Sequence, residues 1–377
     1  MANILLSGIL AFIITFFSIP VIIQVAKSKK LFDEPDERKV NKIVIPTLGG
    51  LGIFAGVIIA TLLGTPTAVI GTLQYFVAAL LVIFFLGIKD DILILSASKK
   101  FIGQLMAAAI LIQFGGIQIT NMYGFLGIHE IPYFLSIILT LFTIVVITNS
   151  FNLIDGVDGL AGSLGLLTSS LFGFYFAFTG EILYAVMAFS LTGSLIAFLI
   201  YNFHPAKIFM GDTGSLMIGI LNAIFVIKFM SVAGSPALGG TLASAPAIGF
   251  AILIVPLFDT LRVVSLRIIN RRSPFSPDRN HIHHFLLELG FSHKKITFTC
   301  VGANILFIVL AYTLRDSGTT YVMLALTGAA ALGISIVYYL RPRPKTYIAP
   351  QPVIKESIVK SHKILTLAGE GIEQETF

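Results

Sequence analysis

Long apolar stretches separated by short polar segments make up most of this chain. A stretch of about 20 apolar residues is long enough to cross the hydrocarbon core of a bilayer as a helix. The pattern predicts eleven such helices, at residues 3–25, 47–64, 67–88, 101–114, 131–149, 159–178, 182–201, 213–230, 245–268, 296–313 and 319–340. We therefore expect an all-α polytopic membrane protein, with a transmembrane catalytic domain over residues 1–345 and a cytoplasmic tail over 346–377.

The distribution of charged residues predicts how these helices are oriented in the membrane. If the N-terminus lies outside and the C-terminus lies in the cytoplasm, only Lys228 and Arg315 of the 25 Lys and Arg residues fall on the outer side. Such an asymmetry follows the positive-inside rule. Of the 19 acidic residues, only Glu130, Glu181 and Asp316 fall outside. Because that rule does not sort Asp and Glu, their gathering on the inner face indicates an active site there.

Composition narrows the classes of function. Hydrophobic residues make up 56% of the chain and charged residues 12%, against about 25% charged in soluble proteins. A single cysteine, Cys300, excludes an internal disulfide and a cysteine-based metal site. No basic patch stands on a soluble domain, so we expect no nucleic-acid partner. The opening residues lack a basic segment, which predicts a retained first helix and no removable signal peptide.

Two polar clusters lie at predicted inner helix ends. Lys89-Asp90-Asp91 closes the third helix, where a solvated helix end is the simpler explanation. The second cluster places Asn149, Asn152, Asp155 and Asp158 three residues apart, so that they neighbour one another along a helical face. Four oxygen-bearing side chains suit a hard cation or a polar ligand. Helix capping is the alternative, but it needs only one such residue.

Two further clusters combine aromatic, acidic and basic residues. The segment 201–215 contains Asn202, Phe209 and Asp212, and Asp212 falls where the eighth helix should begin. A helix N-terminus favours anions such as phosphate, although Asp212 could also be a plain N-cap. The longest inner loop contains Arg279, His281, His283 and His284. Arginine with histidine suits phosphate recognition, and zinc is the weaker alternative because the pattern is not HExxH.

These motifs, in this order, resemble those of the polyprenyl-phosphate N-acetylhexosamine-1-phosphate transferases. Pro46-Thr-Leu-Gly-Gly50 is similar to the family's PTxGG, and Asp90-Asp91 to its aspartate pair. Lys100 to Gln104 resembles the lysine segment that follows. Asn149 to Leu160 resembles NxxNxxDGxDGL, and Phe209 to Ser215 resembles FMGDxGS. Residues 279–284 resemble the HIHH loop of the N-acetylglucosamine branch, and the likeness covers about residues 1–345.

The resemblance implies transfer of a sugar 1-phosphate from a UDP-N-acetylhexosamine to undecaprenyl phosphate in the bacterial cytoplasmic membrane, with release of UMP. Mg²⁺, or Mn²⁺ in its place, would be held by Asp212 and Asn152. Asp90 would engage the lipid phosphate, with Asp91, Asp155 and Asp158 as further catalytic candidates. The remaining candidates are expected to bind substrate: Lys42, Lys100, Asn149, Gly156, Asn202, Phe209, Arg279, His281, His283 and His284.

Other classes stay open at this point. A phospho-N-acetylmuramoyl-pentapeptide transferase would differ mainly in the donor sugar. A cation transporter would keep acidic residues along a path near the bilayer midplane, and the chain shows no internal repeat of the kind such transporters carry. An intramembrane aspartyl protease would leave the loop of arginine and histidine without a role. The glycan pathway, the exact hexosamine and a homodimeric state are not fixed by the sequence.

Overall fold

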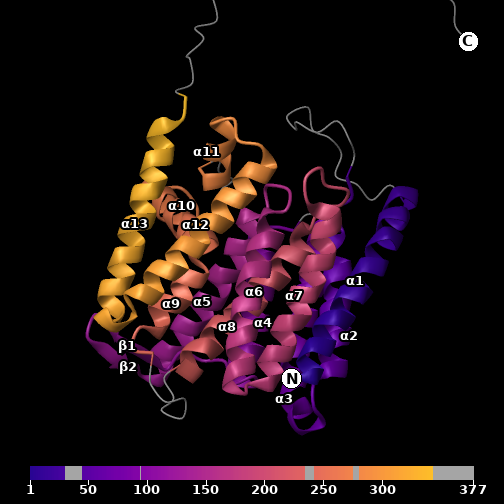
Figure 1. Ribbon diagram of the computed structural model, residues 1–377, viewed down its shortest axis with the longest axis horizontal. Helices are drawn as coiled ribbons and strands as arrows, with labels where there is room; N and C mark the ends of the chain where they lie inside the picture. Colours follow the sequence, from indigo (N-terminus) through magenta and orange to yellow (C-terminus); the bar gives the residue numbers. More distant parts are fainter. Residues whose placement is uncertain (30–44, 94, 234–241, 275–279, 343–377) are drawn as a thin grey trace, which may run out of the picture. The chain divides into compact units, whose positions relative to one another are not determined.

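Helices provide most of the regular structure in the computed structural model, which describes residues 1–29, 45–93, 95–233, 242–274 and 280–342 (Figure 1). The α-helices in these residues are α1 (Ala2–Lys29), α2 (Gly49–Gly64), α3 (Ile70–Leu93), α4 (Ala97–Gln113), α5 (Tyr133–Ile154), α6 (Leu160–Thr179), α7 (Ile182–Asn202), α8 (Gly211–Ala233), α9 (Ala245–Ile252), α10 (Ile254–Ile269), α11 (Ile282–Glu288), α12 (His293–Thr313) and α13 (Thr319–Leu340).

Each predicted apolar stretch overlaps one of these helices, or in one case a pair of them. Eight of the described helices are long and apolar enough to cross a membrane, and nine if the bent pair α9–α10 counts as one span. Helix α2, with 16 residues, is a shorter apolar helix. The expected class, an all-α polytopic membrane protein, is confirmed. The predicted Lys42, Arg279 and tail 346–377 lie outside the described residues.

The helices differ in the share of their residues that is buried, which distinguishes a central helix from a lipid-facing rim. In the apolar window of α8, 83% of the residues are buried, whereas the value for α13 is 17%. Large exposed side chains such as Phe17 on α1, Leu306 on α12 and Leu332 on α13 face outward from the bundle. Apolar side chains on such a rim contact lipid. The polar residues of an active site are therefore expected at the ends or in the centre of the bundle.

The stretch 245–268, expected as one membrane-spanning helix, consists of two helices. Helices α9 and α10 meet at an angle of 88°, and Pro256 lies in the first turn of α10, where its missing N–H costs little. The backbone groups freed by the break are satisfied by the buried Asn304 of α12. Its side chain donates to the Ile252 carbonyl at 2.9 Å and accepts from the Val255 N–H at 3.2 Å. Such repair is required where no water reaches the backbone.

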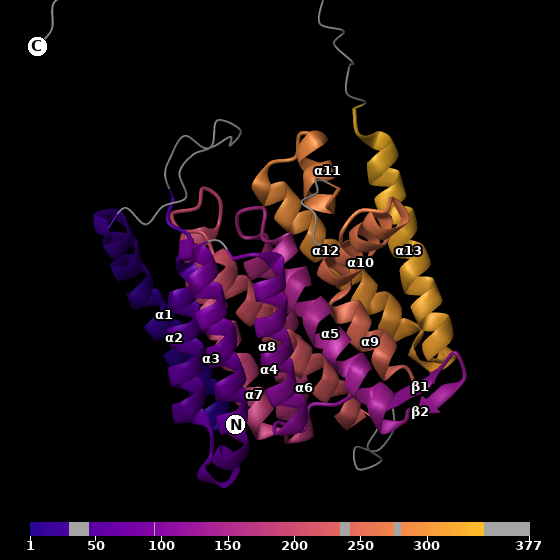
Figure 2. The ribbon, with the colours of Figure 1, turned by 180° about the vertical axis from the view of Figure 1, so that it is seen from behind.

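A small antiparallel hairpin, which the apolar pattern did not predict, joins α4 to α5. Strand β1 (Asn121–Phe125) pairs with β2 (Ile128–Glu130). The Thr319 hydroxyl at the start of α13 donates to the Tyr123 carbonyl at 2.7 Å. The hairpin lies at the end of the bundle opposite α11 (Figure 2). This end also carries the Lys228–Glu181 ion pair, whose charged atoms lie 3.0 Å apart.

Close backbone contacts bring three helix ends together at the polar end. The N–H of Gly49 donates to the Phe209 carbonyl at 2.9 Å, and that of Gly50 to the Met210 carbonyl at 2.8 Å. A Cβ atom at Gly50 would lie 2.2 Å from the Gly214 nitrogen, and one at Gly87 would lie 2.4 Å from the Thr213 Cα. Only glycine permits these approaches, so the PTLGG segment and Gly87 of α3 pack directly against the start of α8.

Gly50→Ala is therefore expected to lower the melting temperature of the purified protein clearly. Its methyl group would meet backbone atoms that cannot move aside, and such overpacking costs about 1–3 kcal/mol. Gly328→Ala is the matched control, because nothing lies within 4 Å of a Cβ at that position on α13. Equal melting temperatures for the two variants would contradict the close approach of α2 and α8.

Candidate active site

The polar helix ends surround one cavity of about 600 Å³. Helices α3, α5 and α7 end at this level, and α2, α4, α6, α8 and α12 begin there. The predicted site residues that line the cavity are Asp90, Asp91, Asn152, Asp155, Gly156, Asp158, Asn202, Phe209 and Asp212. Thr47, Gly211 and His293 line it as well. Residues as far apart in sequence as Thr47 and His293 therefore meet in one place.

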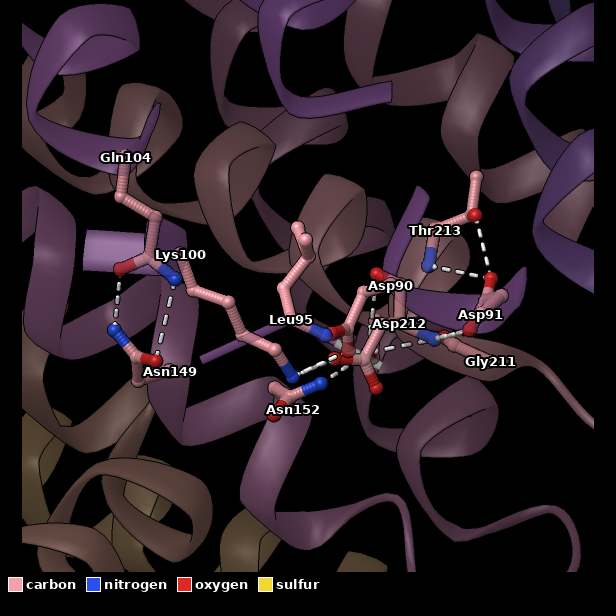
Figure 3. Close-up of polar contacts among 11 residues, drawn as sticks. Asp90, Asp91, Leu95, Lys100, Gln104, Asn149, Asn152, Gly211, Asp212 and Thr213 are labelled. Atoms are coloured by element: carbon pink, nitrogen blue, oxygen red, sulfur yellow. Dashed lines mark hydrogen bonds and ion pairs between the residues drawn. The ribbon is translucent and has the colours of Figure 1, made fainter. Parts of the chain in front are cut away.

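Asp91 caps the N-terminus of α8. Its carboxylate accepts hydrogen bonds from the N–H of Asp212 at 2.7 Å and from the N–H and hydroxyl of Thr213 at 3.1 and 2.6 Å (Figure 3). A carboxylate at this position also interacts favourably with the helix dipole. The expectation that this helix end binds a phosphate is thus wrong for these two N–H groups, because the protein's own Asp91 occupies them.

Lys100 bridges two carboxylates of the cavity. Its Nζ lies 2.6 Å from the Asp212 carboxylate and also contacts the Asp90 carboxylate. Asp90 is 8% exposed and accepts a second bond from the Leu95 N–H at 2.5 Å. Asp212 is therefore not the plain N-cap considered above, since its side chain points to Lys100 of α4 (Figure 3). Lys100 balances part of the negative charge of the pair.

The donor set of the cavity fits a hard divalent cation. Asp90 and Asp212 contribute carboxylate oxygens to the same wall, and Asn152 lies beside them. The Asn152 amide donates to the Ser215 hydroxyl at 3.0 Å, and this bond fixes the amide through its nitrogen. Mg²⁺ prefers oxygen ligands and takes one or two carboxylates together with substrate phosphates. The residues present thus match that preference.

Asn149 and Asn202 have structural partners. The Asn149 amide donates to the Gln104 side chain at 2.6 Å and to the Val145 carbonyl at 2.8 Å, so it joins α5 to α4. Asn202, which lines the cavity, accepts from the Gly159 N–H at 2.9 Å and donates to the Ile208 carbonyl at 2.9 Å. Both side chains therefore hold neighbouring segments in place.

Asp155 and Asp158 lie in the turn between α5 and α6 and differ in their surroundings. Burial, together with the negative charges of Asp212, Asp91 and Asp158, raises the pKa of Asp155 well above its ordinary value. Burial also disfavours the charged form of Asp158, but hydrogen bonds with His293 and His204 outweigh it and leave its pKa lowered. Asp155 is the carboxyl better able to keep a proton near neutral pH.

Two histidines without a predicted role hold Asp158. The Nδ1 atoms of His204 and His293 lie 2.7 and 3.3 Å from its carboxylate oxygens, and the Thr297 hydroxyl donates to its carbonyl at 3.2 Å. Among the described residues, Asp158, His204 and His293 form the cluster whose ligand atoms converge as they would around a metal. Within the described part of the chain, histidines 281, 283 and 284 do not form a second cluster of this kind.

The histidine segment, which contains His281, His283 and His284 at the start of α11, lies next to the cavity. A Cβ on Gly156 would lie 2.6 Å from the His283 Nε2 atom, so the ring sits against the cavity wall at a position that only glycine leaves open. Burial, followed by the neighbouring charge of His284, lowers the pKa of His283 to about 3. His283 is therefore a neutral hydrogen-bonding group at physiological pH and cannot supply the positive charge expected for phosphate recognition.

Comparison with known proteins finds a match between residues 73–230 and the family model described as glycosyl transferase family 4. The chain is 33% identical over 313 residues to the probable undecaprenyl-phosphate N-acetylglucosaminyl 1-phosphate transferase of Bacillus subtilis (strain 168), covering 82% of this chain and 85% of that protein. It is 35% identical over 314 residues to the decaprenyl-phosphate N-acetylglucosaminephosphotransferase of Mycobacterium tuberculosis (strain ATCC 25618 / H37Rv), covering 77% of each.

A third similar protein has a lower identity to this chain. The undecaprenyl-phosphate alpha-N-acetylglucosaminyl 1-phosphate transferase of Escherichia coli (strain K12) is 28% identical over 279 residues, which cover 72% of this chain and 73% of that protein. The part that matches the family model contains the carboxylates of the cavity and ends before the histidine segment. The matched range and the cavity therefore overlap in sequence.

Proposed function

Because the chain belongs to glycosyl transferase family 4, and within it to the polyprenyl-phosphate N-acetylglucosamine-1-phosphate transferases, we propose that it transfers N-acetylglucosamine 1-phosphate from UDP-N-acetylglucosamine to undecaprenyl phosphate. The protein is an enzyme of the phosphotransferase class. The observation that carries the proposal is the cavity at one end of the bundle, where Asp90, Asp212 and Phe209 meet. A diphosphate donor and a membrane-bound phosphate can both reach such a site.

The reaction replaces one phosphoanhydride bond with another. A phosphate oxygen of the lipid forms a bond to the sugar-linked phosphorus of the donor, and the bond from that phosphorus to the UMP oxygen breaks. The second pKa of a phosphate monoester is about 6, so the acceptor is largely ionised at neutral pH. Asp90 then acts by positioning the acceptor more than by removing a proton, and a single displacement suffices.

We assign the divalent cation to Asp212, with Asn152 as the neutral oxygen donor beside it. Bound there, Mg²⁺ would neutralise charge on the diphosphate as the leaving group departs. Lys100 contacts both Asp90 and Asp212, so it keeps the two carboxylates close despite their repulsion. Phe209, whose backbone N–H donates to the Pro46 carbonyl at 2.7 Å, offers an aromatic face to the uracil base.

The donor specificity can be tested directly. Purified protein with undecaprenyl phosphate and Mg²⁺ is expected to release UMP from UDP-N-acetylglucosamine or a close UDP-N-acetylhexosamine, and not from UDP-N-acetylmuramoyl-pentapeptide. A site with fixed hydrogen-bonding groups discriminates by several orders of magnitude against substrates that leave those groups unpaired. UMP release with the pentapeptide donor alone would place the chain in the muramoyl branch instead.

The cavity is proposed to face the cytoplasm of a bacterial cell. In a Cys300→Ser background, which removes the one buried thiol, Lys207→Cys at the cavity end is expected to stay unlabelled by an impermeant maleimide added to intact cells. Leu126→Cys, 68% exposed in the hairpin at the other end, should be labelled. The opposite pattern would invert the topology inferred from the basic residues.

A further inference from the structure

A buried carboxylate of α10 holds the histidine segment, and the sequence motifs do not include it. Asp259 is 2% exposed. Its Oδ1 atom accepts from the Arg262 guanidinium at 2.8 Å and from the Ile282 N–H at 3.1 Å, whereas Oδ2 lies 2.9 Å from His281 Nδ1. The two oxygens therefore have separate tasks. Oδ1 fixes the start of α11, and Oδ2 contacts only the imidazole among these three partners.

This contact determines which nitrogen of His281 is free. A carboxylate oxygen can only accept, so the Nδ1 atom of His281 must carry the proton that it shares with Asp259. The other ring nitrogen, Nε2, is buried and has no hydrogen-bond partner within the described part of the chain. A buried nitrogen without a partner is unfavourable. Such a nitrogen is available to form a hydrogen bond with a ligand.

The free nitrogen belongs to an array that leads to the cavity. The rings of His281 and His283 are nearly parallel, with an interplanar angle of 9° and centroids 5.9 Å apart. His283 in turn lies against Gly156 of the cavity wall. Asp259, His281 and His283 thus connect α10 to the substrate cavity through side chains that are all buried.

We propose that Asp259 is a positioning residue of the transfer reaction, which fixes the Nδ1–H form of His281 so that Nε2 meets the bound substrate. The inference rests on the proposed function, because it assigns a substrate contact to the histidine segment. Carboxylates that orient metal-ligating histidines change metal affinity or activity by about 10- to 100-fold when they are replaced, and we expect an effect of that size for a histidine that contacts substrate.

Asp259→Asn tests this sharply. The Asn side chain keeps an oxygen for Arg262 and Ile282 but turns an NH₂ group towards His281, so the ring must expose a protonated Nε2. We expect kcat/KM to fall by roughly 10- to 100-fold with little change in melting temperature. Asp259→Glu, which keeps the carboxylate, is expected to restore part of the rate. Glu181→Gln, the same chemical change of an acid to its amide at the opposite end of the bundle, should leave the rate unchanged.

A double-mutant cycle separates positioning from mere structural support. In a His281→Ala background, Asp259→Asn is expected to cause almost no further loss, because its effect passes through His281. A full additional loss in that background would overturn the proposal, as would an unchanged rate in the single variant.

A spectroscopic measurement keeps the test independent of folding and of activity. The ¹⁵N shifts of histidine-labelled parent protein at about pH 8 should show His281 protonated at Nδ1, and protonation at Nε2 would refute the proposal. If the parent protein released no UMP from any donor, the proposed function would fail, while the nitrogen shifts would still decide the state of His281.

Discussion

Replacing Asp212 by asparagine is expected to lower turnover by about a thousandfold, a loss comparable to removing a strong electrostatic contact from a transition state. The change keeps the size of the side chain and removes its charge. Asp212 lies beside Asp90 and Asn152 in the cavity wall, and its only ion-pair partner among the described residues is Lys100 at 2.6 Å. Without its negative charge, the site should bind Mg²⁺ and the diphosphate more weakly together.

Three measurements check this expectation. UMP release gives the turnover, a Mg²⁺ titration of the rate gives the apparent cation affinity, and calorimetry gives the affinity for UDP-N-acetylglucosamine. Asp316→Asn is the matched control, since this side chain is 87% exposed at the opposite end of the bundle. Normal turnover in excess chelator, or a fully active Asp212→Asn enzyme, would remove the cation from the proposed mechanism.

The apolar pattern predicted most of the helices because a membrane span is a local feature of sequence. About 20 consecutive apolar residues suffice to identify one, whatever its neighbours are. The break between α9 and α10 is different, because it depends on Asn304, which lies 52 residues after the Ile252 carbonyl that it satisfies. Pro256, in the first turn of α10, is a local signal near that break.

The motifs located the cavity but not the tasks of the side chains within it. Asp90 and Asp91 are adjacent in sequence, yet one contacts Lys100 and the other caps α8. Which of the two faces α8 depends on the close approach that Gly87 allows, and helix periodicity does not report such approaches. Asp259 was missed for a similar reason, since an isolated acid within an apolar stretch gains its meaning only from the partner that packs against it.

The second large effect separates the acceptor from the donor. Asp90→Asn is expected to lower kcat by about a thousandfold, as loss of a contact made mainly in the transition state would, while the affinity for UDP-N-acetylglucosamine stays near normal. The reason is that Asp90 is placed on the acceptor side, where the Leu95 N–H and Lys100 hold its carboxylate. The Leu95 bond is compatible with asparagine, so the fold of this corner should persist.

Phe209→Ala is expected to show the opposite signature, with weaker donor binding and a smaller change in kcat. Loss of a stacked aromatic face costs about 1–3 kcal/mol per base, which corresponds to roughly a 5- to 150-fold loss of affinity. The backbone of Phe209 is held by Pro46 and Gly49, so truncation of the ring should leave the loop in place. Phe178→Ala, at a side chain that is 86% exposed, is the matched control.

Calorimetric titration of UDP-N-acetylglucosamine into both variants, alongside turnover, distinguishes the two roles. Lys100 is the complication, because it contacts Asp90 and Asp212 at once. If Asp90→Asn loses donor affinity as completely as Asp212→Asn does, the two carboxylates act as one cation site and the acceptor-side role of Asp90 is wrong. If donor affinity survives while turnover falls, Lys100 serves to hold two carboxylates of different function at a short distance.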